Sequence, residues 1–117
     1  EIAGAGPLNN TFFTNHYSPD DTSEASKAFV DAYVKAYNQK PDAPAVLGYD
    51  GARLMIDAIS RAGGTDGAKV SKALAETKNY KAVTGDTSLN ETHDAVKSAV
   101  IIEFKDGKQA YRATVKP

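Results

Sequence analysis

The chain has 117 residues, enough for one folded domain that buries roughly 65% of the surface its unfolded form exposes. Its hydrophobic fraction of 41% and charged fraction of 25% are those of ordinary globular proteins, and a net charge of -1 excludes a strong overall attraction to nucleic acid or anionic membranes. The absence of cysteine excludes disulfides, thiolate catalysis and cysteine-ligated zinc.

The amino-terminal residues predict a cut chain followed by a short strand. Residues 1–7 look like the frayed end of a helix running into a turn, and they lack the pattern of an export signal, so we expect a piece of a longer protein whose signal lies upstream. A β-prone run then predicts a strand over residues 11–16.

A first helix is expected over residues 22–39. Asp21 followed by Glu24 forms a capping box at its start. Aromatic residues recur every four positions on this helix: Phe29, Tyr33 and Tyr37. We expect this stripe to pack into a core, with a ligand-stacking face as the alternative.

A second helix is predicted to start at Asp42 and to end at the glycine pair 63–64. Its expected buried face has helical spacing: Ala52, Met55, Ile56 and Ile59. On its surface three charged residues stand four apart: Arg53, Asp57 and Arg61. We interpret them as an exposed ion-pair ladder rather than an anion site. A third helix, capped by residue 65 or 66, should direct Val70, Ala73 and Leu74 inward.

The last third of the chain predicts strands. A strand is expected over residues 83–89, a turn over 90–94 and an apolar strand over 99–104. The Asp106–Gly107 pair favours a tight hairpin turn, after which one face of the return strand should carry Tyr111, Ala113 and Val115. The expected order is β-α-α-α-β-β-β, an α/β arrangement that ends in a β-hairpin.

No residue pattern points to catalysis. His16 and His93 are the only histidines, each stands in a polar turn or at a strand end, and neither accompanies a nucleophile motif. His16 with Asp20 and Asp21 is too loosely spaced to predict a metal site. We therefore expect a chain that is not an enzyme and has no metal or cofactor.

Several sequence blocks, in order, resemble the closing third of leucine/isoleucine/valine-type periplasmic binding proteins of bacterial ABC importers. They are Phe12-Phe13-Thr14-Asn15-His16-Tyr17-Ser18, Ala28-Phe29-Val30-Asp31-Ala32-Tyr33, Pro41-Asp42-Ala43-Pro44-Ala45-Val46-Leu47-Gly48-Tyr49-Asp50, Ala73-Leu74-Ala75-Glu76-Thr77-Lys78 with Val83-Thr84-Gly85, and Val96-Lys97-Ser98-Ala99-Val100-Ile101-Ile102 with Asp106-Gly107-Lys108. Their order and spacing over nearly the whole chain make the resemblance specific.

The resemblance implies a three-layer, type 1 periplasmic-binding fold with two lobes that close over an amino acid or amide. Residues 11–95 would then supply mainly hinge strands and amino-terminal-lobe helices, and residues 96–117 the hairpin of the other lobe. It also implies an extracytoplasmic location, either in the periplasm or as a cell-surface lipoprotein of a Gram-positive bacterium, and a membrane permease as partner. Nucleic acid is not an expected partner.

The resemblance further implies that most ligand-binding residues, including the acid that binds the ammonium, lie upstream. An aromatic residue that often forms part of the pocket wall aligns with Pro44. The other candidates for pocket or hinge contacts are Asn15, His16 and Tyr17.

Two further functions stay open from the sequence. The same fold serves as the ligand-sensing domain of receptors or regulators, and an enzyme built on α/β architecture is not excluded by fold alone. Because the isolated chain would expose apolar helix faces and strand edges that pair elsewhere in a two-lobed protein, we also expect it to self-associate.

Overall fold

The computed structural model describes residues 6–18 and 20–117. Its elements, in chain order, are a 3-10 turn η1 (Gly6–Leu8), β1 (Phe12–Asn15), α1 (Glu24–Tyr37), α2 (Ala43–Ala62), α3 (Gly67–Ala75), β2 (Tyr80–Ala82), β3 (Gly85–Leu89), β4 (Ala95–Val96), β5 (Ala99–Lys105) and β6 (Lys108–Val115). The predicted mixture and order of helices and strands is confirmed, with the short strands β2 and β4 added. The frayed helix end expected at the start lies mostly outside the described residues.

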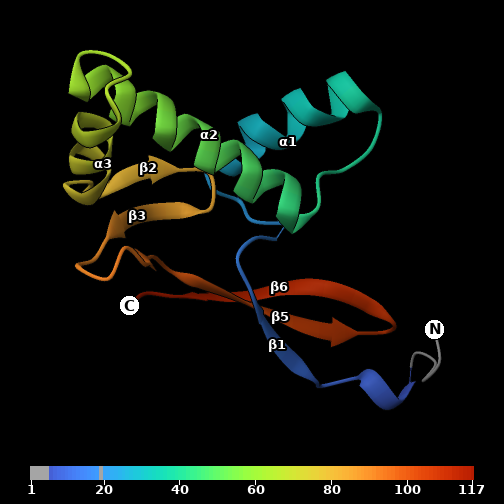
Figure 1. Cartoon of the computed structure of the whole chain (residues 1–117). Helices are drawn as coiled ribbons and strands as arrows, with labels where there is room; N and C mark the ends of the chain where they lie inside the picture. The colour runs from blue at the N-terminus through green and yellow to red at the C-terminus, as the bar shows by residue number, and fades with distance from the viewer. Residues whose placement is uncertain (1–5, 19) are drawn as a thin grey trace.

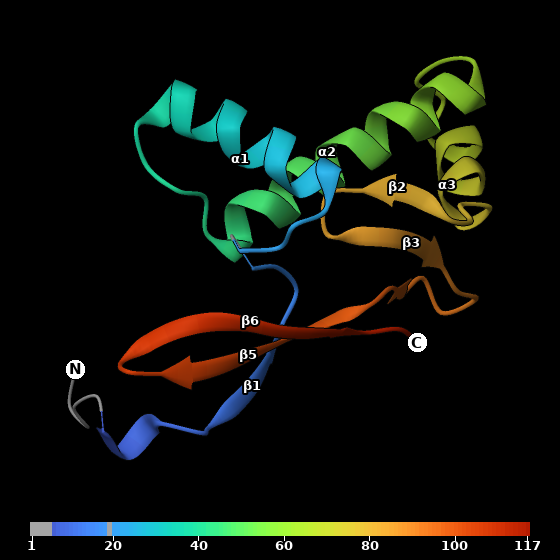
Figure 2. The same cartoon turned by 180° about the vertical axis from the view of Figure 1, so that it is seen from behind.

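The strands form two antiparallel three-stranded sheets, β1-β5-β6 and β2-β3-β4. The three helices gather beside β2 and β3, while the β1-β5-β6 sheet lies on the opposite side of that hairpin (Figures 1 and 2). Within the described residues the chain passes between these two parts at residues 16–18 and 20–23, and again at 97–98. None of the described helices combines the length and apolar character needed to cross a membrane.

The helix ends follow capping chemistry, with one correction. Asp42 caps α2 by accepting a hydrogen bond from the Ala45 amide at 2.9 Å, and Gly63 closes the helix in the left-handed conformation. The capping box predicted at Asp21 is wrong, because Ser23 is the residue that caps α1. Asp21 instead accepts from the Ser23 amide at 2.9 Å, so it shapes the turn that leads into the cap.

The buried face of α2 differs from the predicted one. Val46 and Ala58 are fully buried and Asp50 nearly so, whereas Met55 is 43% and Ile56 66% exposed. α2 carries apolar residues on more than one side, and its described neighbours are α3, β2 and, through Asp50, the turn of the β2–β3 hairpin. Periodicity alone could not decide which apolar stripe would be covered.

The closing hairpin has the predicted turn but not the predicted strand face. Asp106 and Gly107 both adopt positive φ, at 50° and 76°, as a two-residue hairpin turn requires. Tyr111 pairs with Ile102 and Ala113 pairs with Ile101, so a β-bulge lies between them. Tyr111 and Ala113 therefore point to opposite faces, and the prediction that they share one is wrong.

The core is small and lies where the parts meet. The buried apolar residues of the described chain are Tyr17, Val46, Ala58, Ala73, Val100 and Ile102. Val100 and Ile102 alternate along β5, so one face of the β1-β5-β6 sheet turns toward the helical part. This sheet face, with residues 16–18 and 20–23, forms the junction at which the candidate site lies.

Candidate functional site

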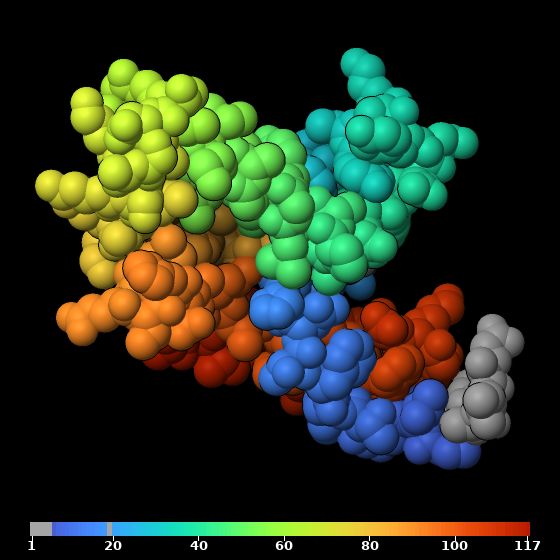
Figure 3. Space-filling view, viewed as in Figure 1, coloured from blue at the N-terminus to red at the C-terminus, as the bar shows by residue number. Residues whose placement is uncertain are grey.

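A crevice opens between the start of α2 and the β1-β5-β6 sheet, and we call it the α2–sheet crevice. Its volume is about 280 Å³. Its lining residues are Asn15, Tyr17, Ser18, Asp20, Pro41, Asp42, Ala43, Ile102 and Gln109. In the space-filling view the blue part of the chain lies between the green start of α2 and the red strands (Figure 3).

The α2–sheet crevice is lined by both polar groups and apolar side chains. Asp20 and Asp42 contribute carboxylates, Asn15 and Gln109 contribute amides, and buried Ile102 supplies the apolar surface. Carboxylates accept hydrogen bonds from an ammonium, and amide N–H groups donate to a carboxylate. The set is therefore suited to a small zwitterion with an apolar side chain.

Tyr17 separates this crevice from a second one. Its side chain is 3% exposed, and its hydroxyl oxygen has no hydrogen-bond partner among the described residues. Burial, together with the charges of Asp20 and Asp21, raises the pKa of Tyr17 to about 12. The phenol therefore keeps its proton at neutral pH and remains a hydrogen-bond donor.

The second crevice, the β2–β3 crevice, lies between the β2–β3 hairpin and the same sheet, with a volume of about 330 Å³. Its lining includes His16, Tyr17, Thr84, Ser98 and Val100. His16 is exposed, and its backbone amide donates to the Asn15 Oδ1 at 2.8 Å. The crevice therefore brings both passages of the chain between the two parts together.

The structure places the four predicted site residues at different points of this junction. Asn15 and Tyr17 line the α2–sheet crevice, and His16 lines the β2–β3 crevice. Pro44 is exposed in the first turn of α2, next to Ala43 but outside the lining of either crevice. All four remain proposed ligand or hinge contacts.

Four polar residues of the α2–sheet crevice escaped the sequence analysis as site residues: Ser18, Asp20, Asp42 and Gln109. Asp42 stood out only as the start of a helix, and its Oδ1 does perform that cap. Gln109 follows the hairpin turn, and no local pattern marks it. Only the pairing of β6 with β5 brings it beside Ile102.

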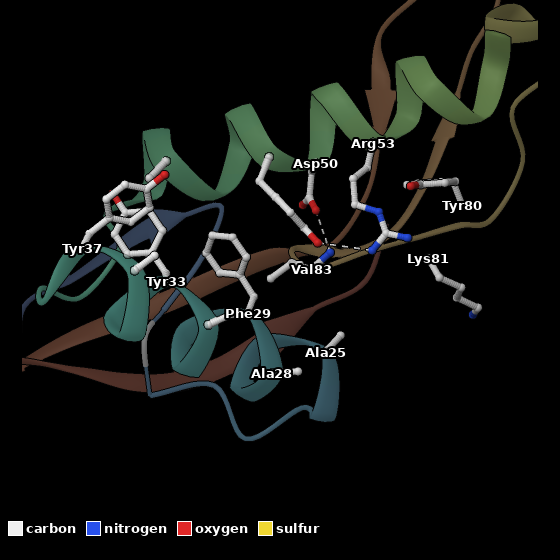
Figure 4. A pocket seen from close by; sticks show the side chains of 14 residues that line it. Ala25, Ala28, Phe29, Tyr33, Tyr37, Asp50, Arg53, Tyr80, Lys81 and Val83 are labelled. Atoms are coloured by element: carbon white, nitrogen blue, oxygen red, sulfur yellow. Dashed lines mark hydrogen bonds between the residues drawn. The ribbon is translucent and has the colours of Figure 1, made fainter. Parts of the chain in front are cut away.

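The aromatic stripe of α1 does not pack into a core as predicted. Phe29, Tyr33 and Tyr37 line a groove between α1 and α2 with a volume of about 530 Å³, and Tyr37 is 64% exposed. Phe29 lies against Tyr49 of α2, with the two ring centroids 4.8 Å apart. Figure 4 shows Phe29, Tyr33 and Tyr37 in a row along α1. The lining of this α1–α2 groove is mainly alanine and aromatic, and the described elements leave it uncovered.

The predicted charge ladder on α2 forms only in part. Arg61 pairs with Asp57 at 2.7 Å and also donates to the Thr77 hydroxyl at 2.9 Å. Arg53 instead donates to the Tyr49 hydroxyl at 3.4 Å. Among residues 6–18 and 20–117, no three histidine, cysteine or acidic side chains cluster as a metal site would need.

This chain belongs to the periplasmic binding protein family, whose sequence model matches residues 1–109. The Leu/Ile/Val-binding protein homolog 2 of Brucella abortus is 30% identical over 106 residues, which cover 87% of this chain and 27% of that protein. The family is a solute-binding class rather than an enzyme class. The chain spans about a quarter of the length of the curated relatives it matches.

Solved structures share the fold over nearly the whole chain. A leucine binding protein LivK of Thermotoga maritima is 34% identical, with a TM-score of 0.83, over 97% of this chain and 33% of that one. LivJ of Streptococcus pneumoniae, in complex with isoleucine, is 35% identical with a TM-score of 0.80, over 98% and 33%. A solute binding protein of Rhodopseudomonas palustris, in complex with 3,4-dihydroxybenzoic acid, is 30% identical with a TM-score of 0.81, over 97% and 33%. The expected type 1 periplasmic-binding fold is confirmed.

Proposed function

We propose that this chain is the carboxyl-terminal part of the solute-binding component of an ABC importer, which captures a branched-chain or other small amino acid between two lobes. The observation that carries the proposal is the similarity, over 97% and 98% of the chain, to a leucine binding protein and to an isoleucine-bound transporter protein. The polar composition of the α2–sheet crevice supports it.

We propose that the two lobes divide at the two passages of the chain. Residues 11–95 would contribute hinge strands and the helices of one lobe, and residues 96–117 the hairpin of the other. The support is that the helices and the β5–β6 hairpin lie on opposite sides of β2 and β3 (Figure 1). Because β1 pairs with β5, the stretch from Asn15 to Tyr17 leads directly from the hairpin's sheet toward α1.

Binding a zwitterion between lobes requires partners for both charges, because an unpaired buried charge costs several kcal/mol. In this chain Asp20 and Asp42 are acceptors at the crevice, and Asn15 and Gln109 can donate. The remaining contacts would come from the upstream polypeptide. Closure of the lobes would then remove the ligand from water and tighten capture.

Thermal unfolding of the full-length protein tests the ligand class. L-leucine, L-isoleucine and L-valine should each raise the melting temperature, since a ligand at about 100 times its Kd stabilises the folded state by about 2.7 kcal/mol. Benzoate tests a second candidate class of ligand, the aromatic carboxylates. Two solute-binding structures from Rhodopseudomonas palustris, 28% and 30% identical to this chain, are complexes with benzoate and with 3,4-dihydroxybenzoic acid. Stabilisation by benzoate alone would select that class, and no shift with any compound would contradict the proposal.

The proposed partner is a membrane permease, and the proposed location is outside the cytoplasm, in the periplasm or as a cell-surface lipoprotein. The alternative is a sensor domain of a receptor or regulator. The neighbouring coding sequence separates the two: a lipoprotein signal upstream supports transport, whereas a membrane helix joined to a signalling domain supports sensing.

A further inference from the structure

The middle of α2 is bonded to the turn of the β2–β3 hairpin through one buried carboxylate. Asp50 is 8% exposed, and it accepts hydrogen bonds from the amides of Val83 and Thr84 at 2.8 and 2.9 Å. The Thr84 hydroxyl donates to the same carboxylate at 2.7 Å. Figure 4 shows Asp50 pointing from α2 toward Val83. Asp50 therefore fixes the hairpin turn against the helix.

Lys97 extends this arrangement to the β1-β5-β6 sheet. Its ammonium donates to the Thr84 hydroxyl, whose single proton is already directed at Asp50. Lys97 stands between β4 and β5, where the chain passes to that sheet, and the next residue, Ser98, lines the β2–β3 crevice. A continuous hydrogen-bonded chain thus joins α2, the hairpin turn and the passage at 97–98. We call it the Asp50–Thr84–Lys97 chain.

A gain in folding stability does not explain why residue 97 carries an ammonium group. Lys97 is half-buried, and burial lowers the pKa of Lys97, an effect that the charge of Asp50 offsets only in part. Lys97 donates to the Thr84 hydroxyl rather than to Asp50 itself, so an apolar side chain of similar length would avoid that desolvation and leave the three hydrogen bonds to the Asp50 carboxylate in place. The charged group therefore calls for a role other than stability.

We propose that Lys97 is a positioning residue: through Thr84 and Asp50 it fixes the orientation of the β1-β5-β6 sheet relative to α2, and it thereby sets the equilibrium between open and closed lobes without touching the ligand. The expected effect on ligand affinity rests on the proposed function. The expected effect on sheet orientation concerns only the passage at 97–98. A ligand binds the closed form better, so a change in closure energy appears as a change in affinity.

The test uses the full-length protein and three variants. Lys97→Met removes the donor and keeps the length, Lys97→Arg keeps a donor, and Lys72→Met is the matched control. Lys72 lies on α3, where its ammonium pairs with Glu76 at 3.9 Å and its side chain is 78% exposed. The readouts are melting temperature, leucine affinity, the change in radius of gyration on adding leucine, and hydrogen exchange of residues 97–100.

Lys97→Met should keep or raise the melting temperature, weaken leucine binding about tenfold and speed exchange at residues 97–100, because the passage loses its anchor. Lys97→Arg should recover most of the affinity, and Lys72→Met should change none of these readouts. Unchanged affinity and exchange in Lys97→Met, or a loss of affinity matched by a loss of melting temperature, would overturn the inference. If the unmodified protein binds no leucine, the proposed function fails, and hydrogen exchange still decides the positioning role.

Discussion

The carboxylate of Asp50 in α2 accepts hydrogen bonds from both the amide and the hydroxyl of Thr84, 34 residues further along the chain. Hydrogen bonds to a charged group contribute about 1.5 to 3 kcal/mol each, and an unsatisfied buried donor adds its own desolvation cost. Asp50→Ala should therefore lower the free energy of unfolding of the full-length protein by about 3 kcal/mol. Urea unfolding followed by circular dichroism measures the change.

Asp57→Ala is the control for this prediction, because Asp57 is on the same helix but its side chain is 39% exposed. Its pair with Arg61 is a surface contact between residues four apart, worth a few tenths of a kcal/mol, about 0.3 to 0.5. Equal destabilisation by the two substitutions would show that the Asp50 contacts do not anchor the hairpin.

Tyr17→Phe removes a buried hydroxyl that has no hydrogen-bond partner among the described residues. Because such a group costs about 1 to 3 kcal/mol, the variant should be about 1 kcal/mol more stable at pH 7. Thermal or urea unfolding measures it, with Tyr37→Phe, at an exposed tyrosine, as the neutral control. A destabilised Tyr17→Phe variant would mean that the hydroxyl does form a bond.

The same tyrosine predicts a pH dependence. Burial raises the pKa of Tyr17 from its ordinary value of 10.0 to about 12. The unfolded state therefore loses the phenolic proton at a lower pH than the folded state does. Titration of Tyr17 leaves the free energy of unfolding unchanged below pH 10 and lowers it as the pH rises from 10 through 12. The fall in stability over this window should be steeper for the unmodified protein than for Tyr17→Phe, and parallel curves would contradict the prediction.

Pro44 offers a gain-of-function prediction. The family resemblance implies that an aromatic residue often forms part of the pocket wall at the position of Pro44. Here Pro44 is exposed in the first turn of α2, next to Ala43, which lines the α2–sheet crevice. Pro44→Phe should tighten leucine binding about fivefold, since added apolar contact contributes about 1 kcal/mol. Calorimetry checks it against Lys69→Phe on α3. A similar change in both variants would remove Pro44 from the ligand wall.

The isolated 117-residue chain should self-associate. Large apolar side chains are exposed on several elements: Phe12, Met55, Ile56, Tyr37 and Val115. Exposed apolar surface of this kind, with the open edges of two three-stranded sheets, favours association between copies. Light scattering should show a mass that rises with concentration. A clean monomer with one cooperative unfolding transition would contradict this.

The sequence predicted the elements whose signals are local. Asp42 and Gly63 mark the two ends of α2 by their capping chemistry, and Asp106 with Gly107 marks the closing turn. Each depends on the conformation of only a few neighbouring residues. The family resemblance rested on such blocks in order, and the comparisons confirm it.

Features that depend on distant parts of the chain were beyond sequence reasoning. The bulge at Arg112 arises from the pairing of β5 with β6 and leaves no mark in the alternation of side chains. The hairpin turn at Val83 and Thr84 lacks the usual glycine pair, and its two amides donate to Asp50, 33 and 34 residues earlier in the chain. Strand β2 was therefore missed. Of the four residues proposed from the sequence, Asn15 and Tyr17 line the α2–sheet crevice, whereas Gln109 joins them only through sheet pairing.

In the proposed function, the full-length protein captures an amino acid by pairing both of its charges. Calorimetric titration with L-leucine tests it most directly, with 4-methylpentanoate, which lacks the ammonium, as the matched ligand. Leucine should bind at one site per molecule and 4-methylpentanoate at least about a hundredfold more weakly, because acceptors for the ammonium would be left unpaired. Absence of heat with leucine, or equal affinity for the two compounds, would contradict the account.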